Sequence, residues 1–401
     1  MPSGPSSPSP STDLPPTGPA ILFTVFEPSG DEHASIVIAE LKRRHPALPI
    51  YAWGGPKMEA AGAHIVERTI DSAVMGLPGL SRIRQHLRVM ARIRRWIRKH
   101  PVALHVPVDS PGANDPICDI TKKRGLRVVH LVAPQIWAWG RWRINKLRRH
   151  TDMLLCLFDF EVSFFTKRRV PARYIGHPFF DRPLDTAELD RKTAGFPVGQ
   201  PRLAMFPGSR PDELQQHFPL ILGAFRELKK RFADLTGVVA AAHPEAERTL
   251  RDLAARHGGW PDDVRMVMGE TNAVVRWCDL ALVKSGTTTL QVARQAKPMI
   301  VFYRRGSLLF YLFIGRVIVA TKHFSLPNIL ARRRIIVELV PHFGGPDRII
   351  READALLRSP ELMERQRTDL RQVMAPLMAG GAAARAADAI EEFAGIMPVP
   401  R

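Results

Sequence analysis

Short apolar runs alternate with longer segments of helical periodicity in the first part of the chain. The segments 33–45 and 82–99 predict helices. The apolar runs predict strands at 21–26, 49–53, 103–108, 127–132 and 153–157. Strands that alternate with helices are typical of a mostly parallel sheet with right-handed crossover connections. Residues 21–180 therefore predict one α/β domain.

A second series of the same kind predicts strands at 203–206, 237–241, 264–267, 279–283 and 299–302. A chain of 401 residues exceeds the size at which a single hydrophobic core stops growing, so we assign 203–360 to a second α/β domain. Residues 181–202 are polar and contain three prolines, which indicates a linker. The Ala-, Arg- and Glu-rich segment 361–398 predicts helices, which we expect to pack back on the first domain.

Each series begins with a strand that runs into a turn of small residues and then into a helix. The first turn reads EPSGD at 27–31, and the second reads PGSR at 207–210. In open α/β sheets such turns present backbone N–H groups and a helix N-terminus to an anion or a sugar. The pattern predicts two nucleotide-binding-like domains that face one cleft. Arg210 favours a diphosphate ligand, because a guanidinium binds phosphate oxygens through paired hydrogen bonds.

The charge of the chain narrows the classes of partner. Fifty-eight Lys and Arg against 39 Asp and Glu give a net charge of +19. Such a surface attracts nucleic acid, anionic lipid or phosphorylated substrates, and the total alone does not choose among them. An arginine-rich composition inherited from a GC-rich genome is the alternative explanation. Because no zinc-finger or RNP-like motif is present, we expect no specific nucleic-acid partner.

Cysteine and metal-ligand patterns are sparse. The three cysteines are far apart and form no CxxC pair, which predicts buried free thiols in a reducing compartment: Cys118, Cys156 and Cys278. The sequence has no DxD cluster at a strand end and no His/Cys spacing typical of a metal site. We therefore expect neither a metal nor a cofactor.

The ends and the apolar segments bear on localisation. Residues 1–20 are rich in Pro and Ser, which predicts a disordered tail. They lack the basic and apolar regions of a secretory signal. No stretch reaches the ~20 apolar residues that a membrane-spanning helix needs, and the nearest, 308–320, is short and contains Arg316. The sequence predicts a cytoplasmic protein that at most lies on a membrane surface.

The segment 82–99 is a strongly basic amphipathic helix with two interpretations. Its arginines cover most of the surface outside one apolar stripe, which consists of Ile83, Leu87, Met90, Ile93, Trp96 and Ile97. The helix either docks on anionic headgroups, or it is a crossover helix whose stripe packs on its own sheet. The apolar loop 75–80 before it favours membrane contact.

These segments together carry a family resemblance. The motifs in the first half are EPSGD (27–31), GGPKMEAAG (54–62), VMG (74–76), VDSPGAN (108–114), APQIWAWGRWRINK (133–146) and IGHPF (175–179). Those in the second half are FPGSR (206–210), SGTTTLQ (285–291), PMIVFYR (298–304) and SLPNIL (325–330). In order and spacing the chain resembles the lipid-A-disaccharide synthase family of glycosyltransferases.

The resemblance implies a GT-B architecture, with two Rossmann-like domains whose parallel sheets face an interdomain cleft. It implies an inverting transfer of 2,3-diacylglucosamine from its UDP derivative to 2,3-diacylglucosamine 1-phosphate. The products would be a β-1,6-linked disaccharide and UDP. The first domain would bind the acceptor and face the membrane, and the second would bind the UDP-sugar. The family works at the inner face of the inner membrane, and the oligomeric state stays open.

The resemblance also assigns roles around the acceptor. Asp109 follows a strand and matches the aspartate of the family's D-[AS]-P motif, so it is expected to be the general base; a turn-capping role is the alternative. Gly112 stands where the family usually has a further aspartate. Asn114 is expected to bind a sugar hydroxyl. The other expected acceptor-binding residues are Glu27, Ser29, Gly30, Asp31 and Met75, of which Ser29 and Asp31 are equally suited to cap a helix.

On the donor side, Arg210 is the expected diphosphate ligand. Gln291 replaces a family glutamate that binds ribose hydroxyls, which should weaken the donor site. The family's Glu-Leu-Leu-Gln motif reads ELVP at 338–341, so a uridine contact is missing. Glu213 is expected only to stabilise its helix through the helix dipole. The expected UDP-binding residues are Gly208, Ser209, Arg210, Ser285, Gly286, Thr287, Gln291 and Asn328.

Two other functions remain open at this point. The departures at Gly112 and Gln291 are compatible with a sugar-nucleotide epimerase or with a transferase that uses another acceptor. A non-catalytic lipid-binding relative is the second alternative. Nucleic-acid binding ranks last.

Overall fold

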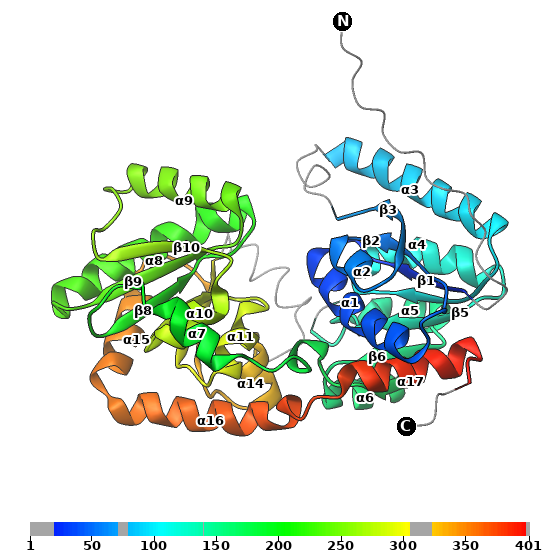
Figure 1. Cartoon of the computed structure of the whole chain (residues 1–401). Helices are drawn as coiled ribbons and strands as arrows, with labels where there is room; N and C mark the ends of the chain where they lie inside the picture. The colour runs from blue at the N-terminus through cyan, green and yellow to red at the C-terminus, as the bar shows by residue number, and fades with distance from the viewer. Residues whose placement is uncertain (1–19, 71–78, 139, 305–322, 398–401) are drawn as a thin grey trace, which may run out of the picture. The chain divides into compact units, whose positions relative to one another are not determined.

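A computed structural model describes residues 20–70, 79–138, 140–304 and 323–397 (Figure 1). The predicted disordered tail, the candidate substrate residue Met75 and the apolar segment 308–320 lie outside these residues, apart from Ala20. The described chain divides into two compact units. Unit 1 comprises the described residues up to 182 and from 380 onward, and unit 2 comprises those between 183 and 379.

Unit 1 contains a seven-stranded sheet in which all neighbouring strands are parallel, in the order β3-β2-β1-β4-β5-β6-β7. Its strands are β1 (Ala20–Thr24), β2 (Ile50–Gly54), β3 (His64–Arg68), β4 (Val102–Pro107), β5 (Arg127–Leu131), β6 (Met153–Cys156) and β7 (Ala172–Tyr174). Each strand predicted from an apolar run is present, because strands buried on both faces read as continuous apolar segments. The two edge strands β3 and β7 were not predicted, since neither is such a run.

The helices of unit 1 connect and cover these strands. They are α1 (Pro28–Arg44), α2 (Pro56–Ala60), α3 (Gly79–Lys99), α4 (Pro111–Lys122), α5 (Ile144–His150), α6 (Asp159–Thr166) and α17 (Ala382–Ala394). Short 3₁₀ helices span Arg141–Arg143 and Pro178–Phe180.

The basic helix α3 packs on its own sheet. Val89, Ile93 and Ile97 are buried in one cluster with Leu22 and Trp53 of the sheet. Its Trp96 ring lies 5.2 Å from the ring of Trp53. Its Arg92 forms two hydrogen bonds with Glu67 of β3. The described part of the helix therefore follows the crossover interpretation. Leu87 of the predicted apolar stripe is the exception, since it is 59% exposed.

Unit 2 contains a six-stranded parallel sheet in the order β10-β9-β8-β11-β12-β13. Its strands are β8 (Arg202–Phe206), β9 (Thr236–Ala241), β10 (Val264–Met268), β11 (Leu280–Lys284), β12 (Met299–Arg304) and β13 (Val337–His342). The edge strand β13 was not predicted, and it contains Pro341, which only an edge position tolerates well.

The helices of unit 2 are α7 (Thr186–Thr193), α8 (Pro211–Arg231), α9 (Pro244–Arg256), α10 (Thr271–Trp277), α11 (Thr288–Arg294), α14 (Leu326–Ala331), α15 (Asp347–Arg358) and α16 (Pro360–Met378). Phe218 and Phe225 of α8 are buried with Met205, Leu282 and Phe302 of the sheet in the core of this unit. Helix α7 lies within the predicted linker 181–202 and is joined to α10 by the ion pair of Asp190 with Arg276.

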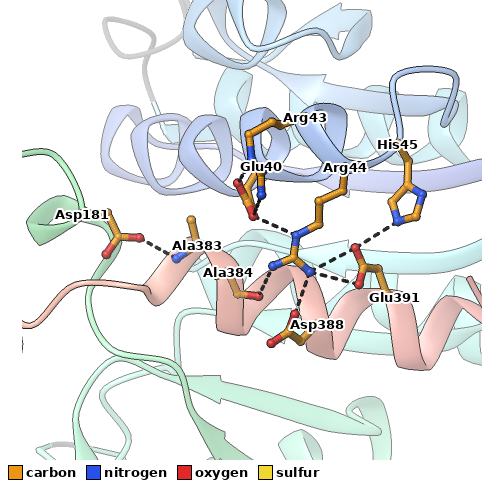
Figure 2. Close-up of polar contacts among 9 residues, drawn as sticks. All are labelled: Glu40, Arg43, Arg44, His45, Asp181, Ala383, Ala384, Asp388 and Glu391. Carbon is orange, nitrogen blue, oxygen red and sulfur yellow. Dashed lines mark hydrogen bonds and ion pairs between the residues drawn. The ribbon is translucent and has the colours of Figure 1, made fainter. Parts of the chain in front are cut away.

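The helices predicted over 361–398 are divided between the units, because α16 belongs to unit 2 and α17 to unit 1. Figure 2 shows how α17 is held. Arg44, at the end of α1, donates hydrogen bonds to Asp388 at 2.6 Å and to Glu391 at 3.1 Å. His45 contacts the other oxygen of Glu391 at 3.0 Å. The Asp181 carboxylate accepts the backbone N–H groups of the first turn of α17.

Candidate functional site

The candidate acceptor residues of unit 1 gather where its strand order reverses. Strands β1 and β4 are neighbours in the sheet, although β2 and β3 separate them in the chain. The turns that follow them, 27–31 and 109–114, therefore meet at the carboxyl edge, which is where open α/β sheets bind ligands. Gly30 packs against the preceding segment, where a Cβ on it would lie 2.9 Å from the Val25 side chain, and that Cβ would lie at ordinary contact distance from Val108, 3.6 Å. The fold thus brings Glu27, Ser29 and Gly30 beside the turn that contains Asp109.

Asp109 occupies a constrained position at the end of β4. Its φ of 46° and the φ of 41° at Ser110 are left-handed, a conformation that non-glycine residues keep only where the surroundings impose it. Its N–H donates to the Leu131 carbonyl at 3.1 Å. Burial raises the pKa of the Asp109 carboxyl, a hydrogen bond from Ser110 lowers it, and the charge of Glu27 raises it further, so the net direction is upward. A carboxylate with a raised pKa is a stronger base.

Asn114 lies beneath this turn, fully buried. Its Nδ2 donates to the carbonyls of Val108 at 3.0 Å and Asp109 at 2.8 Å. Its Oδ1 accepts a hydrogen bond from Thr24 Oγ1 at 2.7 Å. Both amide hydrogens are therefore used inside the protein, and the structure places Asn114 under the loop instead of on the surface where a sugar hydroxyl would bind.

Asp31 is also turned inward. Its two carboxylate oxygens accept the backbone N–H groups of Lys57 and Met58, both at 3.1 Å, so it caps α2, a different helix from its own. Ser29 lies in the first turn of α1, whose N-cap position is taken by Glu27. Asp31 is thus a structural anchor between α1 and α2, whereas Ser29 is half-buried at the turn.

The candidate donor residues of unit 2 gather at the corresponding point of the second sheet. Strands β8 and β11 are neighbours, so the turns 207–210 and 285–287 meet at the carboxyl edge. Gly208 has a φ of +113°, which requires glycine. Arg210 is the N-cap residue of α8, and its side chain is 66% exposed. Gly286 and Thr287 are exposed, and Ser285 is half-buried.

Glu213 connects the 207–210 turn with the end of β11, just before the 285–287 turn. The sequence had predicted for it only a stabilising effect on its own helix. One carboxylate oxygen accepts the N–H of Ser209 at 3.2 Å, and the other accepts Lys284 Nζ at 2.7 Å. Burial raises the pKa of Glu213, but the bond and charge of Lys284 outweigh that effect, so the pKa lies below its usual value. Lys284 was not predicted; the available signal was a lysine at the end of an apolar run, directly before SGTTT.

Two further candidates lie on helices of unit 2. Gln291 is half-buried on α11. Asn328 is fully buried on α14, where its Oδ1 accepts the N–H groups of Ile335 and Ile336. Its Nδ2 donates to the Ile336 carbonyl and to Glu338. The Asn328 amide therefore holds the chain between α14 and β13, with every donor and acceptor occupied.

No group of three or more His, Cys, Asp or Glu side chains in the described part of the chain has an arrangement that would hold a metal ion. The described residues also contain no helix with the length and apolar character needed to cross a membrane.

Comparison with known proteins decides the family. A family model for lipid-A-disaccharide synthetase matches residues 21–381. A curated lipid-A-disaccharide synthase from Anaeromyxobacter dehalogenans is 37% identical over 382 residues, which cover 94% of this chain and 97% of that protein. The chain belongs to the lipid-A-disaccharide synthase family. It is therefore a glycosyltransferase that forms the lipid A disaccharide, and the predicted family is confirmed.

Solved structures show the same fold at low sequence identity. A UDP-N-acetylglucosamine 2-epimerase from Listeria monocytogenes has a TM-score of 0.62 at 13% identity, over 94% of this chain and 96% of that one. An S. aureus MnaA–UDP co-structure has a TM-score of 0.61 at 10% identity, over 94% of this chain and 98% of that one. The predicted two-domain α/β fold of the GT-B class is confirmed. These likenesses establish the fold alone, and family membership separates the chain from the epimerases.

Proposed function

We propose that the enzyme transfers a 2,3-diacylglucosamine unit from its UDP derivative to the 6-hydroxyl of 2,3-diacylglucosamine 1-phosphate. Asp109 acts as the general base. It takes the hydroxyl proton while the oxygen bonds to the anomeric carbon and the bond from that carbon to UDP breaks. The configuration inverts, and UDP leaves. The observation that carries this proposal is the position of Asp109 at the switch point of its sheet, with its pKa raised by burial and by Glu27.

The departing diphosphate is bound in unit 2. The exposed guanidinium of Arg210 and the turns at Gly208-Ser209 and Ser285-Gly286-Thr287 offer charge-assisted and backbone hydrogen bonds to its oxygens. These bonds stabilise negative charge as it develops on UDP. Gln291 contacts the ribose with a neutral amide in place of a carboxylate. Glu27, Ser29 and Met75 contribute to acceptor binding, and no metal or cofactor takes part.

The acyl chains of both substrates place the reaction at a membrane surface. We assign the enzyme to the cytoplasmic face of the inner membrane, bound peripherally to anionic lipid. Trp142 is 66% exposed and Leu87 59% exposed, and the helix α3 that contains Leu87 also carries exposed arginines, including Arg88 and Arg95. Tryptophan favours the headgroup region, and each basic residue near an anionic surface contributes about 1 kcal/mol.

The test is incubation of purified protein with UDP-2,3-diacylglucosamine and the acylated acceptor, with mass spectrometry of the product and measurement of released UDP. We expect one disaccharide per UDP, no product from an unacylated acceptor, and loss of turnover in Asp109→Asn. Full turnover in Asp109→Asn would show that Asp109 is not the general base. Release of UDP without a disaccharide would point to another acceptor. Flotation with anionic and zwitterionic vesicles tests membrane binding, which should require anionic lipid and weaken in Trp142→Ser.

A further inference from the structure

A chain of buried hydrogen bonds runs through unit 1 and ends on the backbone of Asp109. It links Thr121 of α4, His105 of β4, Thr24 of β1 and Asn114 of α4, all of them fully buried. Thr121 Oγ1 lies 3.1 Å from His105 Nδ1, and His105 Nε2 lies 2.8 Å from Thr24 Oγ1. Thr24 then bonds Asn114 at 2.7 Å. None of these four side chains was predicted to act on the Asp109 loop from below.

The direction of these bonds follows from the number of hydrogens available. Asn114 donates both amide hydrogens to the carbonyls of Val108 and Asp109, so its Oδ1 accepts. The single hydroxyl hydrogen of Thr24 goes to that oxygen. His105 must therefore donate from Nε2 to Thr24, so the Nδ1 of the neutral ring carries no hydrogen. Thr121 Oγ1 lies within hydrogen-bond distance of this Nδ1 and also of the carbonyls of Ile117 and Cys118, which compete for its single hydrogen. This tautomer is neutral, in agreement with burial, which lowers the pKa of His105 to about 3.

These hydrogen bonds hold the backbone of the loop that contains Asp109. Two adjacent non-glycine residues, Asp109 and Ser110, have left-handed φ angles, a conformation that costs free energy unless neighbouring groups impose it. The Asn114 amide donates to the carbonyls of Val108 and Asp109, which belong to the two peptide links that flank Asp109. Thr24 fixes the orientation of that amide, and Thr24 ends the strand that leads to the 27–31 turn. This series of hydrogen bonds thus couples the 27–31 turn to Asp109.

We propose that Thr24 and Asn114 are positioning residues, which hold the backbone of Asp109 in the conformation that aims its carboxylate at the acceptor hydroxyl. This inference rests on the proposed role of Asp109 as the base. Because neither side chain is exposed, neither contacts substrate. Their loss should therefore lower kcat and leave the KM values of both substrates little changed.

The experiment compares three threonine variants in the disaccharide assay. Thr24→Val keeps the shape of the side chain but removes the hydroxyl, and we expect kcat to fall about 100-fold, as for a misplacement of roughly 1 Å at a reacting group. Both KM values should stay within about threefold. Thr24→Ser restores the hydroxyl and should recover most of kcat. Thr236→Val is the matched control: Thr236 is a buried strand threonine of unit 2 whose hydroxyl has no partner among the described residues. It should keep wild-type kcat.

A second variant covers the case in which Thr24→Val does not fold. Asn114→Asp keeps an oxygen that accepts from Thr24 and removes the two N–H donors to Val108 and Asp109, so it should show the same fall in kcat. Thermal unfolding gives the folded fraction of each variant. Wild-type kcat in folded Thr24→Val or Asn114→Asp overturns the proposal, as does a Thr24→Ser variant no faster than Thr24→Val. If Asp109→Asn is inactive while these variants are fully active, only the positioning role fails. If Asp109→Asn is active, the base assignment itself fails.

Discussion

The Lys284 ammonium lies 2.7 Å from a carboxylate oxygen of Glu213. Lys284 is the last residue of β11, and Glu213 is in the first turn of α8. The other oxygen of the same carboxylate accepts the Ser209 N–H. The shape of the 207–210 turn therefore depends on a residue from the neighbouring strand, so the two candidate phosphate-binding turns of unit 2 form one connected unit.

Replacing Lys284 by Met should weaken UDP binding about tenfold, or about 1.4 kcal/mol, because Glu213 loses its partner and no longer fixes the Ser209 N–H. Titration calorimetry with UDP measures the effect. Lys284→Arg keeps the charge and should bind UDP more tightly than Lys284→Met. Lys229→Met, which removes another ion pair of unit 2, the one with Asp263, is the control and should bind UDP normally. Equal affinities for UDP in Lys284→Met and wild type would show that the contact of Lys284 with Glu213 does not support UDP binding.

The environment of Asp109 predicts a gain in stability for Asp109→Asn. A raised pKa means that the folded state disfavours the ionised carboxylate. Stability is therefore lost as the pH rises from the ordinary aspartate range through the raised pKa. Asn removes this penalty and accepts the left-handed φ. At neutral pH we therefore expect a higher Tm for Asp109→Asn than for the wild type.

Thermal unfolding across pH checks the sign of this effect. The difference in Tm should close as the pH falls below the ordinary pKa of an aspartate, because the wild-type carboxyl is then neutral as well. Asp119→Asn is the contrasting control. Its hydrogen bond with Lys123 lowers the pKa of Asp119, so the variant should gain no stability. A lower Tm for Asp109→Asn at neutral pH would show that the carboxylate is favourably placed in the folded state.

Glu27→Gln should move the pH profile of the reaction. The charge of Glu27 raises the pKa of Asp109, and a general base must be ionised to act. Removing that charge lowers the pKa, so the rising limb of kcat/KM against pH should shift to lower pH. The position of the limb is the readout, since Glu27 is also proposed to bind the acceptor. Glu32→Gln, an exposed acid on the same helix, should leave the limb in place. A shift of the rising limb to higher pH in Glu27→Gln would contradict the conclusion that the charge of Glu27 raises the pKa of Asp109.

The contact between α1 and α17 gives a stability prediction with a close control (Figure 2). The Arg44 side chain is 12% exposed and Glu391 is 2% exposed. Arg44→Ala leaves Glu391 without that cation, so we expect a loss of about 3 kcal/mol in the free energy of unfolding. Arg44 also pairs with Glu40 of its own helix, as does the exposed Arg43. Arg43→Ala removes only that exposed pair and should leave Tm unchanged. Thermal unfolding of both variants tests this prediction. Equal losses of stability in Arg44→Ala and Arg43→Ala would show that the contacts of Arg44 with α17 do not stabilise the fold.

Much of the fold could be read from local patterns. The strands of both sheets that are continuous apolar runs were predicted, because a strand buried on both faces must be apolar throughout. Of the four edge strands, β10 was predicted from its apolar run, whereas β3, β7 and β13 were not predicted, because polar residues interrupt each of these segments. Helix α3 was predicted with its burial undecided. Which surface an apolar stripe covers depends on what lies opposite, and only the packing with Trp53 answers that.

The sequence by itself determined the alternation of elements, the two glycine turns and the residue types at them, because each follows from neighbours along the chain. Tertiary structure decided which polar side chains face a ligand and which serve the fold. Asn114 bonds Thr24, 90 residues away, Asp31 caps α2, and Glu213 pairs with Lys284, 71 residues away. A hydrogen-bonding group looks the same in a sequence whether its partner is a substrate or the protein, and only folding brings that partner within hydrogen-bond distance.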